Sequence, residues 1–439
     1  VGYAPYDDGV AQGVFIKDAR TGQPIINKQW PGLSVFPDFT NPATAAYWNK
    51  FVEEFITTVP LDALWLDMNE ISGFCNGTCS STPQVGVYAK YDPNNPPFVP
   101  DNGGVRSLEY KTLRMDAQHH IGDQYHVHNI HPIYEINATI PALQKVTGKR
   151  GFIVTRANHP GVGNVAAHWL GDNESTWQSL KLSIAGMINM NFFGIPMVGA
   201  DICGFMGNTT MELCARWTQL GSFYPFSRNH NTLGSIPQEP YVFGRAFVEM
   251  TRDILAVRYS LIPYYYTLFA QVHLNGGSVI KPLFFEFPSP HLAAVDDQFL
   301  VGKGLMVSPI VYEGKRSRKA HFPGQDNWYD YYTGLFLTKG SQDMELYAPL
   351  NFIPVHVRGG VIIPKQAPGM TTDAVRASPF NLLVALNSTK GAAGHLILDD
   401  GEGIDTFANG LYTDICYVAA PAGSSIALRS NVNVGGYRD

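Results

Sequence analysis

Long apolar runs are missing from this chain of 439 residues. None approaches the roughly 20 consecutive residues that a membrane-spanning helix needs, so we expect no membrane span within it. An excess of positive charge is also missing, because 37 Asp and Glu outnumber 31 scattered Lys and Arg. A protein that binds nucleic acid needs a basic stripe to neutralise phosphates. Nucleic acid is therefore excluded as an expected partner.

Cysteines are few, and their spacing disfavours a zinc site. Neither Cys75 with Cys79 nor Cys203 with Cys214 has Cys-x-x-Cys spacing. Each pair is instead close enough along the chain for a local disulfide, which leaves Cys416 over and favours an oxidising compartment. We therefore expect a glycoprotein of the secretory pathway, whether extracellular, cell-wall, vacuolar or lysosomal. Five triplets would accept glycans there: Asn76, Asn137, Asn173, Asn208 and Asn387.

The chain is large enough, with 45% hydrophobic residues, to bury more than one core. Residues 36–287 alternate short apolar runs with helical patterns, which predicts parallel strands joined by crossover helices in an α/β fold. The apolar runs at 63–66, 151–155 and 195–200 end on Asp67, Arg156 and Asp201. Because the carboxyl ends of barrel strands face the active site, charges at these points indicate function.

The residue pattern changes after about residue 288, where short strand-like runs are separated by Gly, Pro, Asn and Asp. This predicts β-sandwich domains. Residues 355–364 read as two strands joined by a tight turn at Gly359 and Gly360. We predict three parts: a catalytic domain at 1–288, a proximal β-sandwich at 289–366 and a distal β domain at 367–439.

Two carboxyl groups stand out as a pair for glycoside hydrolysis, which needs one on each side of the anomeric carbon, about 5 Å apart in a retaining enzyme. Asp67 emerges from a buried strand, where polar neighbours can keep it ionised as a nucleophile. Asp172 follows His168 and Trp169 in a loop before a helical pattern. There an aromatic wall and partial burial would raise its pKa, as a general acid requires.

These segments resemble glycoside hydrolase family 31, the α-glucosidase family. Residues 65–70 match its nucleophile motif Trp-x-Asp-Met-Asn-Glu, and residues 168–173 match its acid/base motif His-Trp-x-Gly-Asp-Asn. Residues 199–205 and 223–231, the latter with a characteristic histidine, match further segments. The resemblance covers nearly the whole chain. It implies Asp67 as nucleophile and Asp172 as general acid and then general base.

The resemblance also implies a pocket around a terminal glucose. Arg156 and His230 would bind its hydroxyls, aromatic and thioether side chains would cover its C–H faces, and Asp201 would support them. No cofactor and no metal are implied. The substrate-binding residues implied are Arg156, His230, Trp65, Met68, Trp169, Asp201, Phe205 and Glu70.

The family fold is a (β/α)8 TIM-type barrel followed by C-terminal β-sandwich domains. The match begins partway into the barrel, so we expect its first strands to be missing from the chain. The family also has Ser on both sides of the arginine, whereas this chain has Thr155 and Ala157. We therefore expect contacts at the rim of the pocket to differ from the family's, whereas the arginine itself is retained.

Structural roles compete with each of these assignments. Asp67 would otherwise cap a turn, and Asp172 would otherwise cap the helix expected over residues 175–187. Arg156 would form a structural ion pair, and His230 would be a satisfied core histidine. Asn173 lies inside the motif, so we expect its glycan triplet to be unused. A histidine-rich region could also suggest a metal site, through His126, His128 and His131.

The leading hypothesis is a retaining, exo-acting α-glucosidase that releases glucose from the non-reducing ends of α-1,4-linked malto-oligosaccharides or starch. The same fold also serves α-xylosidases, transglucosidases and glucan lyases. A catalytically silent carbohydrate-binding or chaperone-like subunit and a metalloprotein are alternatives of other classes. The intact pair Asp67 and Asp172 favours the enzyme, with an oligosaccharide or α-glucan as partner.

Overall fold

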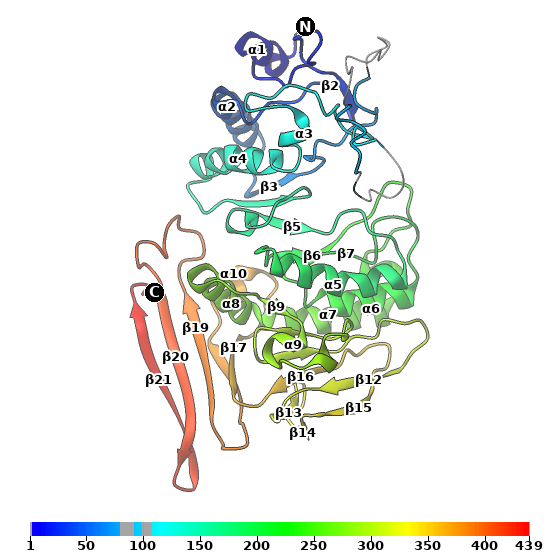
Figure 1. The fold of residues 1–439 in the computed structure, drawn as a ribbon. Helices are drawn as coiled ribbons and strands as arrows, with labels where there is room; N and C mark the ends of the chain where they lie inside the picture. Colours follow the sequence, from blue (N-terminus) through cyan, green and yellow to red (C-terminus); the bar gives the residue numbers. More distant parts are fainter. Residues whose placement is uncertain (1, 80–91, 99, 101–106, 439) are drawn as a thin grey trace. The chain divides into compact units, whose positions relative to one another are not determined.

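A computed structural model describes residues 2–79, 92–98, 100 and 107–438 (Figure 1). The chain divides into two compact units, residues 1–167 and 168–439. Among the described residues, no helix is both long enough and apolar enough to cross a membrane.

The first unit carries the helix and strand that precede the predicted nucleophile. Helix α2 (Pro42–Thr58) begins as the sequence predicts, because the Asn41 side chain accepts a hydrogen bond from the Ala43 N–H (3.1 Å). Strand β3 (Ala63–Leu66) follows and pairs in parallel with β4 (Phe152–Thr155), Leu66 lying opposite Thr155. The residues after both strands, Asp67 and Arg156, therefore leave the pair at the same end.

Helix α4 (His131–Thr147) packs against α2 in this unit. The Trp48 indole N–H donates to Thr139 Oγ1 (2.9 Å), and Lys145 pairs with Glu53 (2.7 Å). A small apolar core in the same unit is formed by Ile16, Ile25, Phe36, Ile71, Leu113 and Ala117. The remaining elements are α1 (Ala4–Gln12), β1 (Asn27–Gln29), β2 (Gly32–Ser34), α3 (Gln124–Val127) and η1 (Val162–Asn164).

The second unit begins with short parallel strands and long helices. Strand β5 (Ala167–Trp169) pairs with β6 (Val198–Gly199), and β7 (Asp201–Ile202) pairs with β8 (Arg228–Asn229). The run predicted to end before Asp201 is thus split, and Asp201 lies within β7. The helices are α5 (Trp177–Phe192), α6 (Met211–Gly221), η2 (Pro240–Phe243), α7 (Arg245–Ser260) and α8 (Ile262–Asn275). A continuous apolar core joins these helices to the strands that follow and includes residues from Leu180 on α5 to Ala385.

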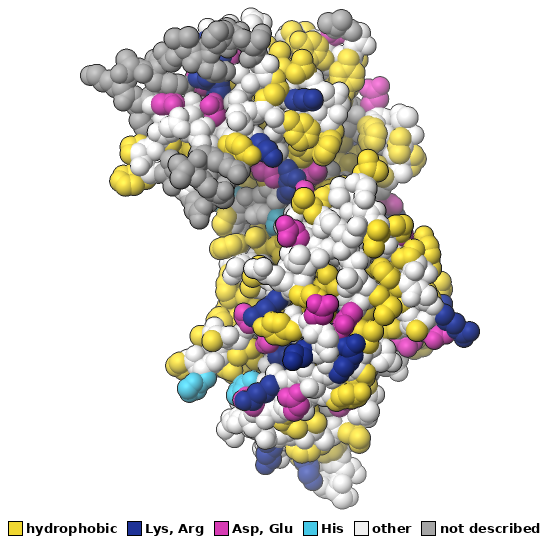
Figure 2. All heavy atoms as spheres, turned by 90° about the vertical axis from the view of Figure 1, so that its right-hand side faces the viewer, with side chains coloured by type: hydrophobic (Ala, Val, Ile, Leu, Met, Phe, Trp, Pro, Cys, Tyr) yellow, Lys and Arg dark blue, Asp and Glu magenta, His cyan; other side chains and the backbone are white. Residues whose placement is uncertain are grey.

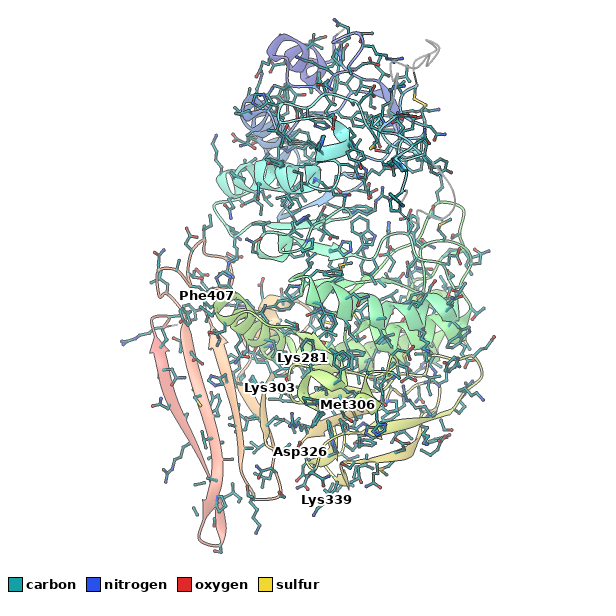
Figure 3. All side chains as sticks on the ribbon, in the orientation of Figure 1. Lys281, Lys303, Met306, Asp326, Lys339 and Phe407 are labelled. Atoms are coloured by element: carbon teal, nitrogen blue, oxygen red, sulfur yellow. A yellow bond between two sulfur atoms is a disulfide. The ribbon has the colours of Figure 1, made fainter. Side chains whose placement is uncertain are left out.

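The C-terminal half of this unit is β-rich, as predicted. A six-stranded sheet has the order β14-β13-β16-β11-β10-β9, and β12 pairs with β15. In Figure 3, the label Met306 marks β11, and Asp326, which pairs with Arg358 (2.9 Å), precedes β13. The bounds are β9 (Ile280–Lys281), α9 (Leu283–Glu286), η3 (Pro290–Leu292), β10 (Phe299–Val301), β11 (Leu305–Val307), β12 (Ser317–Phe322), β13 (Asn327–Asp330), β14 (Phe336–Lys339), β15 (Gln342–Tyr347) and β16 (Val355–Arg358).

A five-stranded sheet follows, with the order β18-β17-β19-β20-β21. The predicted hairpin around Gly359 and Gly360 is wrong: β16 pairs with β11 and β13, whereas β17 belongs to this second sheet. Gly360 has φ 97°, a conformation that suits glycine, and the Gly-Gly turn carries the chain from one sheet to the next. The elements are β17 (Val361–Gln366), α10 (Thr372–Arg376), β18 (Phe380–Ala385), β19 (Ala392–Leu398), β20 (Thr413–Ala422) and β21 (Ser425–Gly435).

Surface charge is mixed, as the composition predicts. Figure 2 shows basic and acidic side chains interspersed on the face that it draws. Several charged side chains of the protein are paired, for example Arg316 with Glu212 and Lys319 with Asp343 (2.8 Å). Such exposed pairs contribute little to stability but keep the surface balanced.

Candidate active site

Asp67 and Arg156 form an ion pair at the carboxyl end of the β3–β4 pair. Arg156 Nη1 lies 3.2 Å from Asp67 Oδ1, and the two side chains are 22% and 32% exposed. The same guanidinium donates from Nε and Nη2 to the two carboxylate oxygens of Glu70, at 2.7 and 3.0 Å. An opposite charge at this distance favours the ionised form of a carboxyl group. Glu70 also borders a cavity of about 600 Å³ in this unit.

The side chain of Asn69 links the residues after β3 to the residues on both sides of Arg156. Its side-chain N–H donates to Thr155 Oγ1 (2.8 Å), and its Oδ1 accepts from the Ala157 N–H (2.9 Å). Asn69 is only 6% exposed. Because Thr155 and Ala157 flank Arg156, this one amide fixes the loop of the arginine to the loop of Asp67.

Trp65 and Met68 are the predicted apolar wall residues beside Asp67. Trp65, on β3, is 48% exposed. Met68 has φ 61°, the left-handed region that non-glycine residues rarely adopt. This conformation turns the chain sharply directly after Asp67 and is typical of functional sites.

Asp172 lies in the exposed loop between β5 and α5 of the second unit. The prediction that it would otherwise cap the helix is wrong, because α5 begins later and its cap is Thr176, whose hydroxyl accepts from the Ser179 N–H (3.1 Å). Thr176 caps the helix four residues further on, so Asp172 has no capping role at α5.

Asn173, which is half-buried, is held by two hydrogen bonds from and to its side chain. Its side-chain N–H donates to the Asp201 backbone oxygen (2.9 Å), and its Oδ1 accepts from the Phe205 N–H (3.2 Å). These bonds position the loop of Asp172 against β7. The expectation that the glycan triplet at Asn173 is unused stays a prediction.

Asp201 and Arg228 form a bidentate pair across β7 and β8. Arg228 Nε and Nη2 donate to the two carboxylate oxygens at 2.7 and 3.1 Å, and the Asp201 side chain is 1% exposed. Burial raises the pKa of Asp201, and the Arg228 guanidinium opposes this shift. Arg228 also lies over the buried Trp169 ring, 5.0 Å from its centroid. Our sequence prediction missed Arg228, although it lies two residues before His230.

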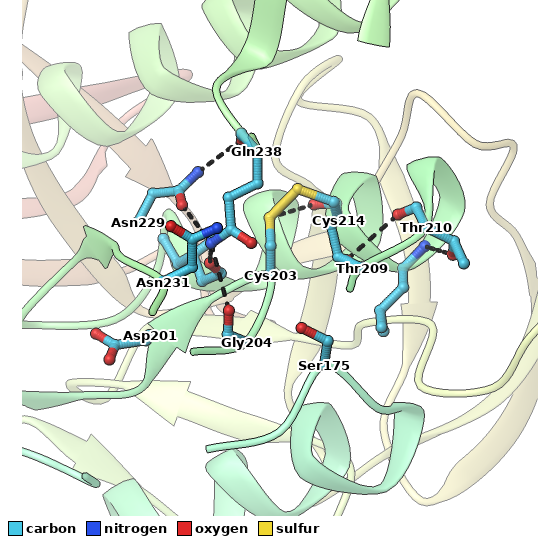
Figure 4. Close-up of a disulfide and its surroundings, with 12 residues drawn as sticks. Ser175, Asp201, Cys203, Gly204, Thr209, Thr210, Cys214, Asn229, Asn231 and Gln238 are labelled. Carbon is cyan, nitrogen blue, oxygen red and sulfur yellow. Dashed lines mark hydrogen bonds between the residues drawn. A yellow bond between two sulfur atoms is a disulfide. The ribbon is translucent and has the colours of Figure 1, made fainter. Parts of the chain in front are cut away.

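Phe205 and His230 contact each other, with ring centroids 5.2 Å apart. The turn before Phe205 is tight: a Cβ at Gly204 (φ 90°) would lie 2.5 Å from the Ser175 backbone. The disulfide between Cys203 and Cys214 fixes the same turn (Figure 4).

Both predicted disulfides are present. Cys75 pairs with Cys79 and Cys203 with Cys214, and Cys416 is a free, partly exposed thiol on β20. Gln238, drawn beside the second disulfide in Figure 4, donates to the Ile202 and Gly204 backbone oxygens (3.1 and 3.3 Å). The disulfide and this amide together brace the loop that carries Phe205.

The histidine-rich region does not assemble into a metal centre in the described residues, where no group of three or more His, Cys, Asp and Glu side chains is placed to hold a metal ion. His126 Nδ1 instead contacts Asp123 (2.5 Å), and His131 is buried between the rings of Phe39 and His119.

The predicted site residues therefore fall into two groups, one in each unit. The approach of Asp67 and Asp172 to each other stays a prediction. The first group is Trp65, Asp67, Met68, Glu70 and Arg156, and the second is Trp169, Asp172, Asp201, Phe205 and His230.

Residues 1–268 match the model of the glycosyl hydrolases family 31 TIM-barrel domain, and residues 276–363 match that of the glycosyl hydrolase family 31 C-terminal domain. The chain belongs to glycoside hydrolase family 31. Its catalytic part is a TIM-barrel domain, and a β-rich C-terminal domain follows it, as predicted.

Known family members are similar to this chain over most of its length. Lysosomal alpha-glucosidase of Mus musculus is 42% identical over 438 residues, 95% of this chain and 45% of that protein. Intestinal sucrase-isomaltase of Homo sapiens is 44% identical over 415 residues, 93% of this chain and 22% of that protein. A crystal structure of a glucosidase II alpha subunit, bound to Glc1Man2, superposes with a TM-score of 0.86 at 29% identity, over 100% of this chain and 44% of that one. The chain thus spans less than half the length of these relatives.

Proposed function

We propose that the protein is a retaining, exo-acting α-glucosidase that releases glucose from the non-reducing ends of α-1,4-linked malto-oligosaccharides or starch. One observation carries the proposal: Asp67, at a strand end, is paired with Arg156 and still one-third exposed. That is the arrangement that a carboxylate nucleophile needs. Two relatives that are more than 40% identical to this chain are named as a lysosomal alpha-glucosidase and an intestinal sucrase-isomaltase, which supports glucosidase chemistry.

In the first step, a carboxylate oxygen of Asp67 attacks C1 of the terminal glucosyl unit. The bond from C1 to the leaving oxygen breaks, and Asp172 gives its proton to that oxygen. The product is a glucosyl ester on Asp67 and a shortened glucan. Arg156 stabilises the ionised Asp67 before the attack and keeps its oxygen directed outward.

In the second step, water replaces the shortened glucan. Asp172, now a carboxylate, takes a proton from the water as its oxygen attacks C1 and the ester bond to Asp67 breaks. Two inversions at C1 give α-glucose. Both carboxyl groups return to their starting states, so the cycle needs no cofactor.

The remaining predicted residues bind the sugar in this proposal. Arg156 and His230 donate to hydroxyls, and Trp65, Met68 and Phe205 contact C–H faces. Asp201 acts through Arg228, which covers the buried Trp169. Glu70 orients Arg156 through its bidentate pair.

We also propose a place in the secretory pathway. The two disulfides need an oxidising compartment, and relatives are named as lysosomal and intestinal.

The proposal is tested with the protein at its natural length, on maltose, isomaltose, starch and α-xylosides, with the anomeric form of the first product followed by NMR. We expect α-glucose as the first product from maltose and at least a hundredfold loss of kcat in Asp67→Asn. Faster hydrolysis of α-xylosides than of maltose would instead identify a xylosidase. A longer glucan as the main product would identify a transglucosidase, and an unsaturated sugar product would identify a lyase. Binding without turnover would identify a silent subunit.

A further inference from the structure

Gln238 follows β8 along the chain, and its side chain is buried, with only 4% of the residue exposed. The amide nitrogen lies among oxygen atoms of two neighbouring segments (Figure 4). It donates to the backbone oxygens of Ile202 (3.1 Å) and Gly204 (3.3 Å), at the end of β7 and in the turn after it. It also donates to Asn229 Oδ1 (2.7 Å) on β8 and lies 3.4 Å from the His230 backbone oxygen. One amide thus joins two segments that carry predicted sugar contacts.

The turn after β7 has an unfavourable backbone conformation that its surroundings must hold. Cys203 has φ 74° and Gly204 has φ 90°, so two successive residues are left-handed, and the first of them is not glycine. Gln238 donates to the carbonyl groups of the residues on both sides of Cys203. Phe205 follows this turn directly. The direction in which Phe205 leaves the turn therefore depends on the Gln238 amide as well as on the disulfide.

On the β8 side, Gln238 and Asn229 form a reciprocal pair. Asn229 Nδ2 donates to the Gln238 backbone oxygen (3.1 Å), and Gln238 Nε2 donates to Asn229 Oδ1. This pair closes the loop that starts with His230. In the same loop, the Thr232 N–H donates to the Phe205 backbone oxygen (3.0 Å). The contact between the Phe205 and His230 rings, with centroids 5.2 Å apart, therefore forms between two segments that share the Gln238 amide.

The orientation of this amide is defined by its surroundings. Its nitrogen faces four oxygen atoms, whereas its Oε1 is buried and has no hydrogen-bond partner among the residues that the structure describes. An exchange of nitrogen and oxygen would place an oxygen against four acceptors, so the donors face these segments. A buried acceptor without a partner costs stability. The N–H donors of Gln238, rather than favourable burial of its side chain, therefore explain an amide at this position.

We propose that Gln238 is a positioning residue for the sugar site: its amide fixes the turn of Phe205 to the loop of His230 and so sets the two rings against each other. The inference rests on the proposed function, in which both rings contact the terminal sugar. Because they contact the sugar before and during the reaction, their misplacement raises KM more than it lowers kcat. A purely structural role would instead reduce the folded fraction, which lowers the apparent kcat at an unchanged KM.

Steady-state kinetics on maltose test this inference with the protein at its natural length. The variants are Gln238→Met, which keeps the length of the side chain but removes its donors, His230→Ala, and the two combined. Gln366→Met is the matched control. Gln366, on β17, is also 4% exposed and donates to the backbone oxygens of Arg376 (3.2 Å) and Ser378 (2.8 Å), so it loses the same kind of contacts outside the site.

We expect Gln238→Met to raise KM about tenfold and to keep kcat within about threefold of the parent. The Gln366→Met control should keep the parental KM within about twofold. The loss of kcat/KM in the combined variant should be at least about fivefold smaller than the product of the two single losses, because Gln238 acts through His230. Asn229→Ala removes the nearest partner of the amide from an exposed position and should raise KM about three- to fivefold.

An unchanged KM in Gln238→Met overturns the inference, as do single losses that multiply in the combined variant. Equal rises of KM in Gln238→Met and Gln366→Met also overturn it. If Gln238→Met fails to fold, Asn229→Ala, alone and combined with His230→Ala, decides by the same criteria. A folded parent protein that hydrolyses neither maltose nor starch contradicts the proposed function itself, so the two failures are distinct.

Discussion

Arg156 Nη1 lies 3.2 Å from Oδ1 of Asp67, at the end of two neighbouring parallel strands. The register that pairs Leu66 with Thr155 produces this contact, because it places the next residue of each strand side by side. One strand pairing thus supplies both the carboxylate and the cation that pairs with it.

Removal of this cation should impair catalysis more than folding. In Arg156→Met, Asp67 and Glu70 become like charges in one loop without compensation. We expect kcat/KM to fall about 10²- to 10³-fold, equivalent to roughly 3–4 kcal/mol of transition-state stabilisation. The measurement is steady-state kinetics on maltose. Arg252→Met, on the exposed side of α7, is the control, and equal losses in both variants would contradict a local role.

The Asp201–Arg228 pair should show strong coupling. Because the Asp201 side chain is 1% exposed, Arg228→Met leaves a buried carboxylate without its cation and should cost about 3–5 kcal/mol of unfolding free energy. The double variant Asp201→Asn with Arg228→Met should recover part of this loss. Denaturant unfolding of the single and double variants measures the coupling. Additive losses would mean that the pair does not act as a unit.

The two disulfides should stabilise the protein unequally. The chain-entropy argument gives about 3 kcal/mol for the loop between Cys203 and Cys214 and about 2 kcal/mol for the shorter loop between Cys75 and Cys79. Replacement of each pair by serine, followed by thermal unfolding, checks the order. Cys416→Ser removes a free thiol and should leave the unfolding temperature unchanged.

His131 should make stability depend on pH. Burial lowers its pKa from 6.5 to about 4, so the unfolded chain takes up a proton before the folded protein does. The contribution of His131 is therefore fully present above pH 6.5 and is lost as the pH falls toward 4, by up to about 3 kcal/mol. The difference in unfolding free energy between the parent and His131→Phe, measured from pH 4 to 7.5, should shrink toward acid. A constant difference would contradict the assignment.

Local patterns predicted the elements that carry the site. The apolar run at 63–66, the Asn41 cap and the two cysteine pairs depend on neighbours in sequence, so they could be predicted without a structure. The cap before α5 could not be assigned correctly, because Asp172 and Thr176 are both good capping residues and only the backbone path decides between them.

Long-range pairings were harder to predict. The segment 355–364 has the pattern of a hairpin, yet its two strands find better partners in two different sheets. Arg228 was missed because its role depends on the β7–β8 register, which places it opposite Asp201. A basic residue two positions before His230 was the only signal in the sequence. The domain boundaries at 288 and 366 stay predictions.

The central claim is that Asp67 is the nucleophile, and peptide mass spectrometry after trapping tests it most directly. The natural-length protein is incubated with 5-fluoro-α-glucosyl fluoride, digested at acidic pH and analysed for a hexose-sized adduct. The account predicts one adduct, on the peptide that contains Asp67, and its loss in Asp67→Asn. An adduct on another residue, or none from a protein that hydrolyses maltose, would contradict the account.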